Sequence, residues 1–395
     1  MDIVYPLSND TWNEDEVKAL NAVVASKHFT MGPKVAEYEK LFAEKFGADY
    51  AVMSNSGSSA NLLAIAALIY SGKLKKGDEI LVTAVSWSTT YFPLSQYGLT
   101  IRFVDIDLDT LNIDTNKLEK AITQNTKGIM AVNLLGNPND YTRILEICHT
   151  HDLILIEDNC ESMGAEYGGT KTGCFGLLGT YSTFYSHHLC TMEGGVTVTD
   201  DEELYHYMLS IRAHGWTRNL PEHSKIYSKM PDGFYESFNF IMPGYNLRPL
   251  EIEAAIGIEQ LKKLDGFIEQ RRDNAKYFSE RIQSFPGIQI QHETGSSSWF
   301  GFAIILTQEL MGKRTIIVNK LLEKGIEVRP IVAGNFVRQK ALMYMDHSIS
   351  GELSNADYIH LNGFFVGNHS KDVHEEIDYL IETLRESIQS ISLDV

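Results

Sequence analysis

Residues 153–158 read LILIED, a short apolar run that ends in two acidic residues. Similar runs precede it, and helical patterns lie between them. Short runs rich in β-branched residues are typical of strands that a sheet buries on both faces. The other runs are DEILVT at 78–83, IRFVDID at 101–107 and GIMAVNL at 128–134, and the helical patterns include 58–69 and 115–121. This alternation predicts an α/β fold.

The character of the sequence changes near residue 248. From 249 to 282 it predicts one or two long helices with an apolar stripe, and Pro249 suits a first helical turn. Later patterns predict strands near 298–306 and 326–330 and a final helix at 373–388. We therefore expect a large α/β domain over residues 1–260 and a smaller α+β C-terminal domain over residues 261–395.

The composition is that of a globular protein with an acidic bias. The formal net charge is −18, and a negative field repels phosphates, so we expect no nucleic acid partner. No apolar stretch reaches the roughly 18 residues that span a bilayer, and the N-terminus does not resemble a secretory signal. The four cysteines have neither zinc-finger spacing nor the density of a disulfide framework. These features predict a soluble cytoplasmic protein without membrane association.

Residues 54–61, SNSGSSAN, form a turn of small residues between an apolar run and a helix. Backbone N–H groups at a helix N-terminus favour an anion, Gly57 allows a phosphate to approach closely, and Ser58 adds a hydroxyl. An ordinary serine-rich helix cap explains the same residues. The turn by itself leaves both interpretations open.

Asp158 ends the strand pattern at 153–158, and Glu161 follows three residues later. Ligands of open α/β sheets bind at the carboxyl ends of strands. A carboxylate at this edge can pair with the protonated nitrogen of a pyridine cofactor, and Glu161 can reach the cofactor or the substrate. Capping of the next helix by Asp158 or Asn159 explains the pattern equally well.

Residues 182–195, STFYSHHLCTMEGG, contain the adjacent histidines His187 and His188. Zinc binding is the competing interpretation, and two structural histidines are the simplest one. Adjacent side chains point in different directions, and the chain offers no second ligand cluster with matching spacing. We therefore expect no metal site.

Residues 244–248, GYNLR, open the long helical pattern. Asn246 is a neutral hydrogen-bond donor, and the guanidinium group of Arg248 can form two parallel hydrogen bonds with a carboxylate or a phosphate. By itself this segment does not identify a ligand.

Taken in this order, the four segments resemble the sugar aminotransferase (DegT/DnrJ/EryC1/StrS) family of PLP enzymes, which modify nucleotide-linked sugars. The family pattern combines S-G-T/S-x-A, E-D-x-x-Q/E, S-F-x-x-x-K-x-x-x-x-x-E-G-G and G-Y-N-x-R. The likeness also covers MGPKVAEYEKLFAEKFG at 31–47 and continues into the C-terminal part. It implies the type I, aspartate aminotransferase-like fold, with a large mixed-sheet domain, a smaller α+β domain and a homodimer that shares its active site.

The resemblance also implies roles for individual residues. The cofactor phosphate would be held by Gly57, Ser58 and Ser182, together with Asn246 of the partner subunit. Asp158 would bind the ring nitrogen, and Trp87, in VSWSTTYFP, would stack on the ring.

One departure from the family pattern bears on the reaction. The position of the family's Schiff-base lysine falls on His187, and no lysine lies nearby. Imidazole cannot form the stable Schiff base that an amine forms, so the cofactor would be held noncovalently, as pyridoxamine phosphate (PMP). This change resembles the dehydratase branch of the family. His187, with an ordinary pKa of about 6.5 against about 10.4 for lysine, would carry the protons.

The resemblance to that branch implies a PMP/PLP-dependent lyase. It would remove the C3 hydroxyl of GDP-4-keto-6-deoxy-D-mannose, and L-glutamate would regenerate PMP. The product would feed the synthesis of colitose-type deoxysugars and O-antigen. Arg248, Arg218 and Arg329 are candidates for the glutamate carboxylate, and His214 and Arg218 are candidates for the substrate pocket, although a structural turn explains the last two equally well.

Three alternatives stay open at this point. A dehydratase of CDP-linked sugars also has histidine for lysine but carries an iron–sulfur cluster, and the cysteines here all precede residue 191 and lack cluster spacing. A plain sugar aminotransferase would need the missing lysine. A noncatalytic regulator would have no reason to keep Asp158, Ser182, Asn246 and the phosphate turn.

Overall fold

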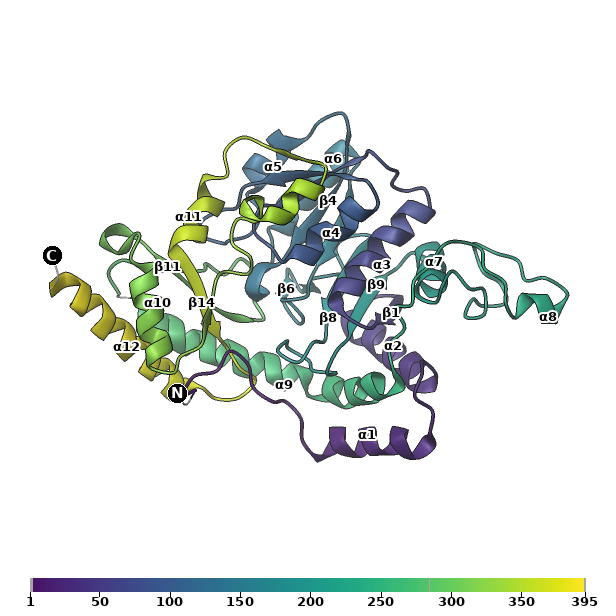
Figure 1. Cartoon of the computed structure of the whole chain (residues 1–395), viewed down its shortest axis with the longest axis horizontal. Helices are drawn as coiled ribbons and strands as arrows, with labels where there is room; N and C mark the ends of the chain where they lie inside the picture. The colour runs from purple at the N-terminus through teal and green to yellow at the C-terminus, as the bar shows by residue number, and fades with distance from the viewer. Residues whose placement is uncertain (1–2, 284, 394–395) are drawn as a thin grey trace.

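The computed structural model describes residues 3–283 and 285–393. Its largest element is an eight-stranded mixed sheet with strand order β1-β9-β8-β5-β4-β2-β3-β13 (Figure 1). Only β9 runs against the other strands of this sheet. The strands are β1 (Tyr50–Ser54), β2 (Glu79–Thr83), β3 (Thr100–Val104), β4 (Thr126–Val132), β5 (Ile154–Asp158), β8 (Leu178–Ser182), β9 (Gly195–Thr199) and β13 (His347–Ile349).

Helices connect these strands and cover the sheet. The connecting helices are α3 (Gly57–Tyr70), α4 (Ser88–Gln96), α5 (Thr115–Ala121), α6 (Tyr141–His151) and α7 (Glu202–Arg212). Helix α3 is apolar around most of its circumference because it packs between the sheet and the helices α4 and α7. The helical cover explains why the parallel strands are near-continuous apolar runs.

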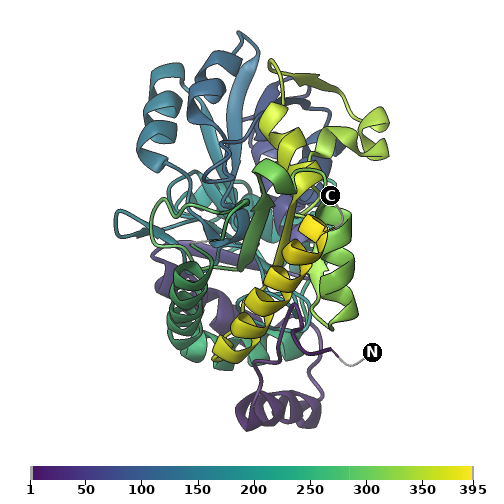
Figure 2. The ribbon, with the colours of Figure 1, turned by 90° about the vertical axis from the view of Figure 1, so that its left-hand side faces the viewer.

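The C-terminal part builds a second sheet, which is antiparallel, with strand order β10-β11-β14-β12. Its strands are β10 (Ile288–Ile290), β11 (Gly301–Leu306), β12 (Val328–Arg329) and β14 (Gly363–Gly367), and its helices are α10 (Arg314–Glu323), α11 (Ser354–Asn362) and α12 (His374–Leu393). Figure 2 shows α12 running beside α10. Phe278, Phe302 and Leu380 belong to the core of this part.

A single helix, α9 (Glu251–Ile282), links the two parts. It packs against α1 (Glu14–Ser26) and α2 (Pro33–Phe46) and also against α12. The expectation that Pro249 occupies the first helical turn is wrong, because Leu250 is the N-cap and its N–H is held by the Glu253 carboxylate at 2.8 Å. The proposed division at residue 260 stays a prediction: α9 runs through it, and β13 joins the large sheet.

Most of the expected elements are present. The runs at 78–83, 128–134 and 153–158 correspond to β2, β4 and β5, and the helical patterns correspond to α3 and α5. Strand β11 starts at Gly301 rather than near residue 298, because Trp299 has a left-handed φ of 47° that an extended strand does not allow. The described helices include none that is long and apolar enough to cross a membrane.

Candidate active site

A cavity of about 800 Å³ opens at one edge of the large sheet. Its wall consists largely of residues at or just beyond the carboxyl ends of strands. These are Ser56, Gly57 and Ser58 after β1, Ser86 and Trp87 after β2, Val132 on β4, Asp158 on β5 and Ser182 on β8. The second sheet closes the cavity with Arg329, Phe365 and the neighbouring Phe300. The cavity therefore occupies the place where open α/β sheets bind ligands.

The N-terminus of α3 points into this cavity. Ser56 caps the helix by accepting a hydrogen bond from the Ser59 N–H at 3.1 Å, and the Ser58 hydroxyl donates to Thr89 Oγ1 at 3.1 Å. A Cβ atom at Gly57 would lie 2.6 Å from the Cβ of Ser182, so only glycine fits there. The turn thus offers a narrow cradle at a positive helix end, which suits a phosphate.

Asp158 lies on the floor of the cavity and is almost fully buried. Its Oδ2 accepts hydrogen bonds from Asn61 Nδ2 at 2.9 Å and from Thr90 Oγ1 at 2.8 Å, and its Oδ1 accepts from the Cys160 N–H at 3.1 Å. These three donors fix the orientation of the carboxylate. Capping of a helix does not explain it, because no helix starts at residue 159.

Glu161 lines the same cavity. One carboxylate oxygen, Oε2, accepts a hydrogen bond from the Leu135 N–H at 3.0 Å. Burial, with a further contribution from the charge of Asp158, raises the pKa of Glu161 to about 7. Near neutral pH this carboxyl group is therefore partly protonated and can donate a hydrogen bond as well as accept one.

The adjacent histidines diverge, as expected. His187 is half-buried and lines the cavity, whereas His188 is fully buried and its Nε2 lies 3.0 Å from the Ser298 carbonyl oxygen. Burial, followed by the positive charge of Arg271, lowers the pKa of His187 to about 4. The Nδ1 atom of His187 is buried and has no partner, so Nε2 is the nitrogen that faces the cavity. Its neutral imidazole is positioned to accept a proton there.

No metal ligand set accompanies the histidines. Within residues 3–283 and 285–393, no three His, Cys, Asp or Glu side chains come close enough to hold a metal ion. The four cysteines are free thiols in the structure.

Two more residues that were expected at the cofactor lie in the cavity wall. Trp87 is the N-cap residue of α4 and is 58% exposed, which is unusual for a tryptophan and leaves its ring face open to a ligand. Ser182 is buried beside Gly57, and its Oγ accepts a hydrogen bond from the Phe184 N–H at 3.3 Å.

The structure separates the remaining candidates. Of the residues expected at the substrate, Arg329 lines the cavity, but Arg218, His214 and Arg248 do not. Arg218 is exposed, with its guanidinium 3.7 Å from the ring centroid of Trp216. His214 is exposed in a left-handed turn with a φ of 66°, which agrees with the structural interpretation of this segment.

Asn246 also lies outside the cavity of its own chain. It is exposed, and its Oδ1 accepts a hydrogen bond from Arg248 Nε at 2.9 Å. Its expected role in the partner subunit's site therefore stays a prediction.

Several lining residues lie far from the motifs in sequence. Leu7 and Ser8 come from the N-terminal segment, and the Leu7 N–H donates to the Glu327 carboxylate at 2.9 Å. The rings of Phe300 and His187 pack edge to face, with 5.1 Å between ring centroids. These residues carry no local pattern, so only the fold brings them to the site. Glu193 also lines the cavity and belongs to the Glu-Gly-Gly turn of the motif at 182–195.

The model of the DegT/DnrJ/EryC1/StrS aminotransferase family matches residues 10–385. A GDP-4-keto-6-deoxy-D-mannose 3-dehydratase of Yersinia pseudotuberculosis is 57% identical over 387 residues, which cover 97% of this chain and 98% of the relative.

Two crystal structures of GDP-4-keto-6-deoxymannose-3-dehydratase are similar as well. One contains a trapped PLP-glutamate geminal diamine, and the other is a histidine-to-asparagine variant with bound GDP-perosamine. Each is 55% identical, has a TM-score of 0.94 and covers 96% of this chain and 100% of the solved chain. The type I, aspartate aminotransferase-like fold is thereby confirmed, and the chain belongs to the DegT/DnrJ/EryC1/StrS aminotransferase family.

Proposed function

We propose that this chain is a PMP/PLP-dependent 3-dehydratase that removes the C3 hydroxyl of GDP-4-keto-6-deoxy-D-mannose. The observation that carries the proposal is that His187 lines the cavity, at the position to which the family resemblance assigns the Schiff-base lysine. None of the described residues that line the cavity is a lysine. A plain aminotransferase of this family needs that lysine, whereas a dehydratase needs a proton carrier that leaves the cofactor amine free.

The residues present fit a pyridoxamine or pyridoxal phosphate. The cradle at Gly57 and the N-terminus of α3 suit its phosphate, and Ser58 and Ser182 add hydroxyls. The fixed carboxylate of Asp158 suits its protonated ring nitrogen, and the open ring face of Trp87 suits stacking. When bound, PMP would supply an amine for the C4 ketone of the sugar and an electron-poor ring that accepts electrons as the C3–O bond breaks.

His187 moves the protons. With PMP bound, its Nε2 would take a proton from the carbon that bears the cofactor amine and would pass a proton to the departing C3 hydroxyl. A neutral imidazole at rest is required for the first transfer, and the lowered pKa of His187 provides it. The same nitrogen carries the proton when L-glutamate restores PMP.

Other cavity residues orient the reactants and exclude water. Phe300 and Phe365 close the side towards the second sheet, and Arg329 supplies a positive charge in an acidic protein. Arg329 therefore suits an anionic group of the substrate or of glutamate. The partly protonated carboxyl group of Glu161 can donate a hydrogen bond to an oxygen of the cofactor or the sugar.

The site is completed by a second subunit in this proposal. Asn246 and Arg248 do not line the cavity of their own chain. Figure 1 shows that a loop carrying α8 (Gly233–Glu236) projects from the body of the molecule. Phe234 and Phe238 on this loop are 80% and 68% exposed. Large exposed aromatic side chains are typical of an interface, so they support a homodimer with a shared active site.

An iron–sulfur dehydratase of CDP-linked sugars is disfavoured by the donor set. The described residues contain no cluster of ligands, and burial raises the pKa of Cys148, Cys174 and Cys190. Thiols that resist ionisation are poor cluster ligands. The free thiols also support the proposed cytoplasmic location, since oxidising compartments favour disulfides.

The proposed product is a 3,6-dideoxy-4-keto sugar on GDP, a precursor of colitose-type units in O-antigen and lipopolysaccharide. The test is incubation with PMP, L-glutamate and either GDP- or CDP-linked 4-keto-6-deoxy sugars, with ammonia and product mass measured. Ammonia release with GDP-4-keto-6-deoxy-D-mannose and a product that has lost the C3 hydroxyl are expected. An amino sugar as the product would show an aminotransferase, and preference for the CDP-linked sugar would overturn the substrate assignment.

A further inference from the structure

Arg271 on α9 is a buried cation without an acidic partner. Its side chain is 3% exposed, and no carboxylate of the described residues forms an ion pair with it. Its Nη1 donates to the carbonyl oxygens of Asn368 at 2.8 Å, Phe300 at 3.2 Å and Trp299 at 3.4 Å, and its Nε has no partner. Burial lowers the pKa of Arg271 to about 10, so the group is still charged at neutral pH. Such a charge is costly to bury and calls for an explanation.

The field of this charge acts on histidines. Beyond the effect of burial, Arg271 lowers the pKa of His187, His188 and His369. The ionisable groups around His187 come from four parts of the chain. They are His188 and Glu193 on its own segment, Asp158 at the end of β5 with Cys160 and Glu161 beyond it, Glu327 and Arg329 at β12, and Arg271 on α9. Arg271 is the main charge among them that acts on His187.

The hydrogen bonds of Arg271 also reach His187 through Phe300. The Phe300 carbonyl accepts from Arg271, and the Phe300 ring packs edge to face with that of His187 and lies 5.7 Å from the ring centroid of His188. Phe300 follows Trp299, whose left-handed backbone turns the two aromatic side chains to different cavities. Arg271 therefore holds the main chain at the point where this aromatic wall meets the histidine.

We infer that Arg271 is a positioning residue for His187: its buried charge keeps the imidazole unprotonated between turnovers, and its hydrogen bonds hold Phe300 against the ring. The inference rests on the proposed role of His187 as the proton carrier. A bound phosphate and a sugar diphosphate are anions, and anions near an imidazole favour its protonated form. The fixed positive charge of Arg271 opposes protonation of the His187 ring, so the imidazole is neutral and can accept a proton when the substrate binds.

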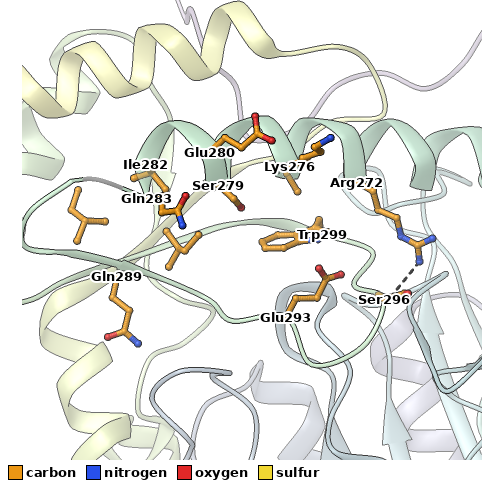
Figure 3. Close-up of a pocket in the computed structure, with 13 residues that line it drawn as sticks. Arg272, Lys276, Ser279, Glu280, Ile282, Gln283, Gln289, Glu293, Ser296 and Trp299 are labelled. Carbon is orange, nitrogen blue, oxygen red and sulfur yellow. Dashed lines mark hydrogen bonds between the residues drawn. The ribbon is translucent and has the colours of Figure 1, made fainter.

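The neighbouring Arg272 is a matched control. It lies next to Arg271 on α9 and binds carbonyl groups of the same segment, with Nε 2.9 Å from the Ser297 oxygen and Nη2 3.3 Å from the Ser296 oxygen. It lines a different cavity, of about 660 Å³. Figure 3 shows Arg272 and Trp299 among the residues of that cavity. Arg272 thus shares the structural task of Arg271 but does not act on the pKa of His187.

The first measurement uses the unmodified protein without cofactor. Histidine-selective ¹³C labelling and NMR titration give the pKa of each ring, and the His187→Asn variant identifies the His187 signal by its loss. We expect a His187 pKa well below the ordinary 6.5, at about 4. A His187 pKa of 6.5 or above would overturn the inference without any arginine variant.

Three variants then separate the effect of the Arg271 charge on the His187 pKa from the effect of losing its hydrogen bonds. Arg271→Met should raise the His187 pKa by about one pH unit or more, the size of shift that a nearby charge produces. Arg271→Lys keeps the charge and should preserve the low pKa, and Arg272→Met should leave it unchanged. The acid limb of the pH–rate profile should move with the His187 pKa in Arg271→Met only. Thermal unfolding of each variant reports fold loss separately.

Each failure has its own signature. An unchanged His187 pKa in folded Arg271→Met, or equal shifts in Arg271→Met and Arg272→Met, overturns the role of Arg271. If Arg271→Met does not fold, a His187 pKa near 6.5 in Arg271→Lys overturns it instead. The titration needs neither cofactor nor sugar, so a low and arginine-dependent pKa in a protein that does not dehydrate the GDP-linked sugar refutes the proposed function only.

Discussion

Replacing each of the two adjacent histidines by asparagine tests the register on which the mechanism depends. His187 lines the cavity, and neither of its ring nitrogens binds another described residue. His187→Asn therefore removes no structural hydrogen bond from the ring. We expect an unchanged unfolding midpoint and nearly normal PMP binding. Loss of the general base should slow both half-reactions by roughly 100-fold or more, or about 2.7 kcal/mol of activation free energy.

His188→Asn should have the opposite profile. The His188 ring is fully buried, and its Nε2 lies 3.0 Å from the Ser298 carbonyl oxygen. The shorter asparagine side chain cannot reach that oxygen in the same way and leaves it without its partner. The cost in unfolding free energy should be about 1–3 kcal/mol, while turnover per folded molecule is largely kept.

The assay combines single-turnover release of ammonia from preformed PMP enzyme with urea unfolding of each variant. A third variant, His187→Lys, should bind PLP covalently, absorb in the visible range and no longer dehydrate the sugar. The reasoning is refuted if His188→Asn abolishes turnover while His187→Asn retains it. In that case the proton carrier is His188 and the mechanism must be reassigned.

Three more predictions concern the cofactor site. Gly57→Ala places a Cβ 2.6 Å from the Cβ of Ser182, so it should weaken PMP binding at least about tenfold, measured by equilibrium dialysis. The control is Gly266→Ala, whose Cβ meets no atom within 4 Å and which should leave PMP binding unchanged. Glu161 has a pKa raised to about 7, so its ionisation destabilises the folded protein as pH rises from about 4.5 to 7. Glu161→Gln should remove this loss of stability, measured as the unfolding temperature at several pH values. An unchanged pH dependence of the unfolding temperature would contradict the raised pKa of Glu161. Asn246→Ala should weaken PMP binding by about 1–3 kcal/mol if the side chain completes the partner subunit's site, and a fully active monomer would argue against it.

The sequence predicted the elements whose signal is local. Runs such as 153–158 are buried on both faces, so each residue carries the pattern, and the strands appear where expected. Strand β13 was missed because it has three residues and pairs with β3 across more than 240 positions of the chain. The start of α9 was placed too early because the helix-start preference of Pro249 was applied two residues before the first helical residue, Glu251.

The residues of the candidate site also differ in whether the local sequence marks them. Gly57 follows a predicted apolar run and Asp158 ends a predicted strand, and parallel strands bring their carboxyl ends to one edge, so the proximity of these two residues could be expected. Ser182 was expected beside them only from the family resemblance, because the strand that it ends was not predicted. Phe300 and Arg271 have no such marker. Arg271 belongs to a charged helical pattern that suggests exposure, and only the structure shows that the small sheet buries it behind the histidines.

The buried charge behind position 187 also bears on why histidine suits this site. A lysine at 187 would place an ammonium group where the buried charge that acts on this position, Arg271, is also positive and has no carboxylate beside it. Burial and like charge both disfavour the protonated amine, so a lysine there would be neutral and nucleophilic and would capture PLP. A neutral imidazole meets the same field without forming a covalent bond. Burial and the charge of Arg271 disfavour a positive charge on any side chain at position 187. They therefore keep the imidazole of His187 neutral, and for the same reason they should keep the amine of His187→Lys neutral and able to bind PLP covalently.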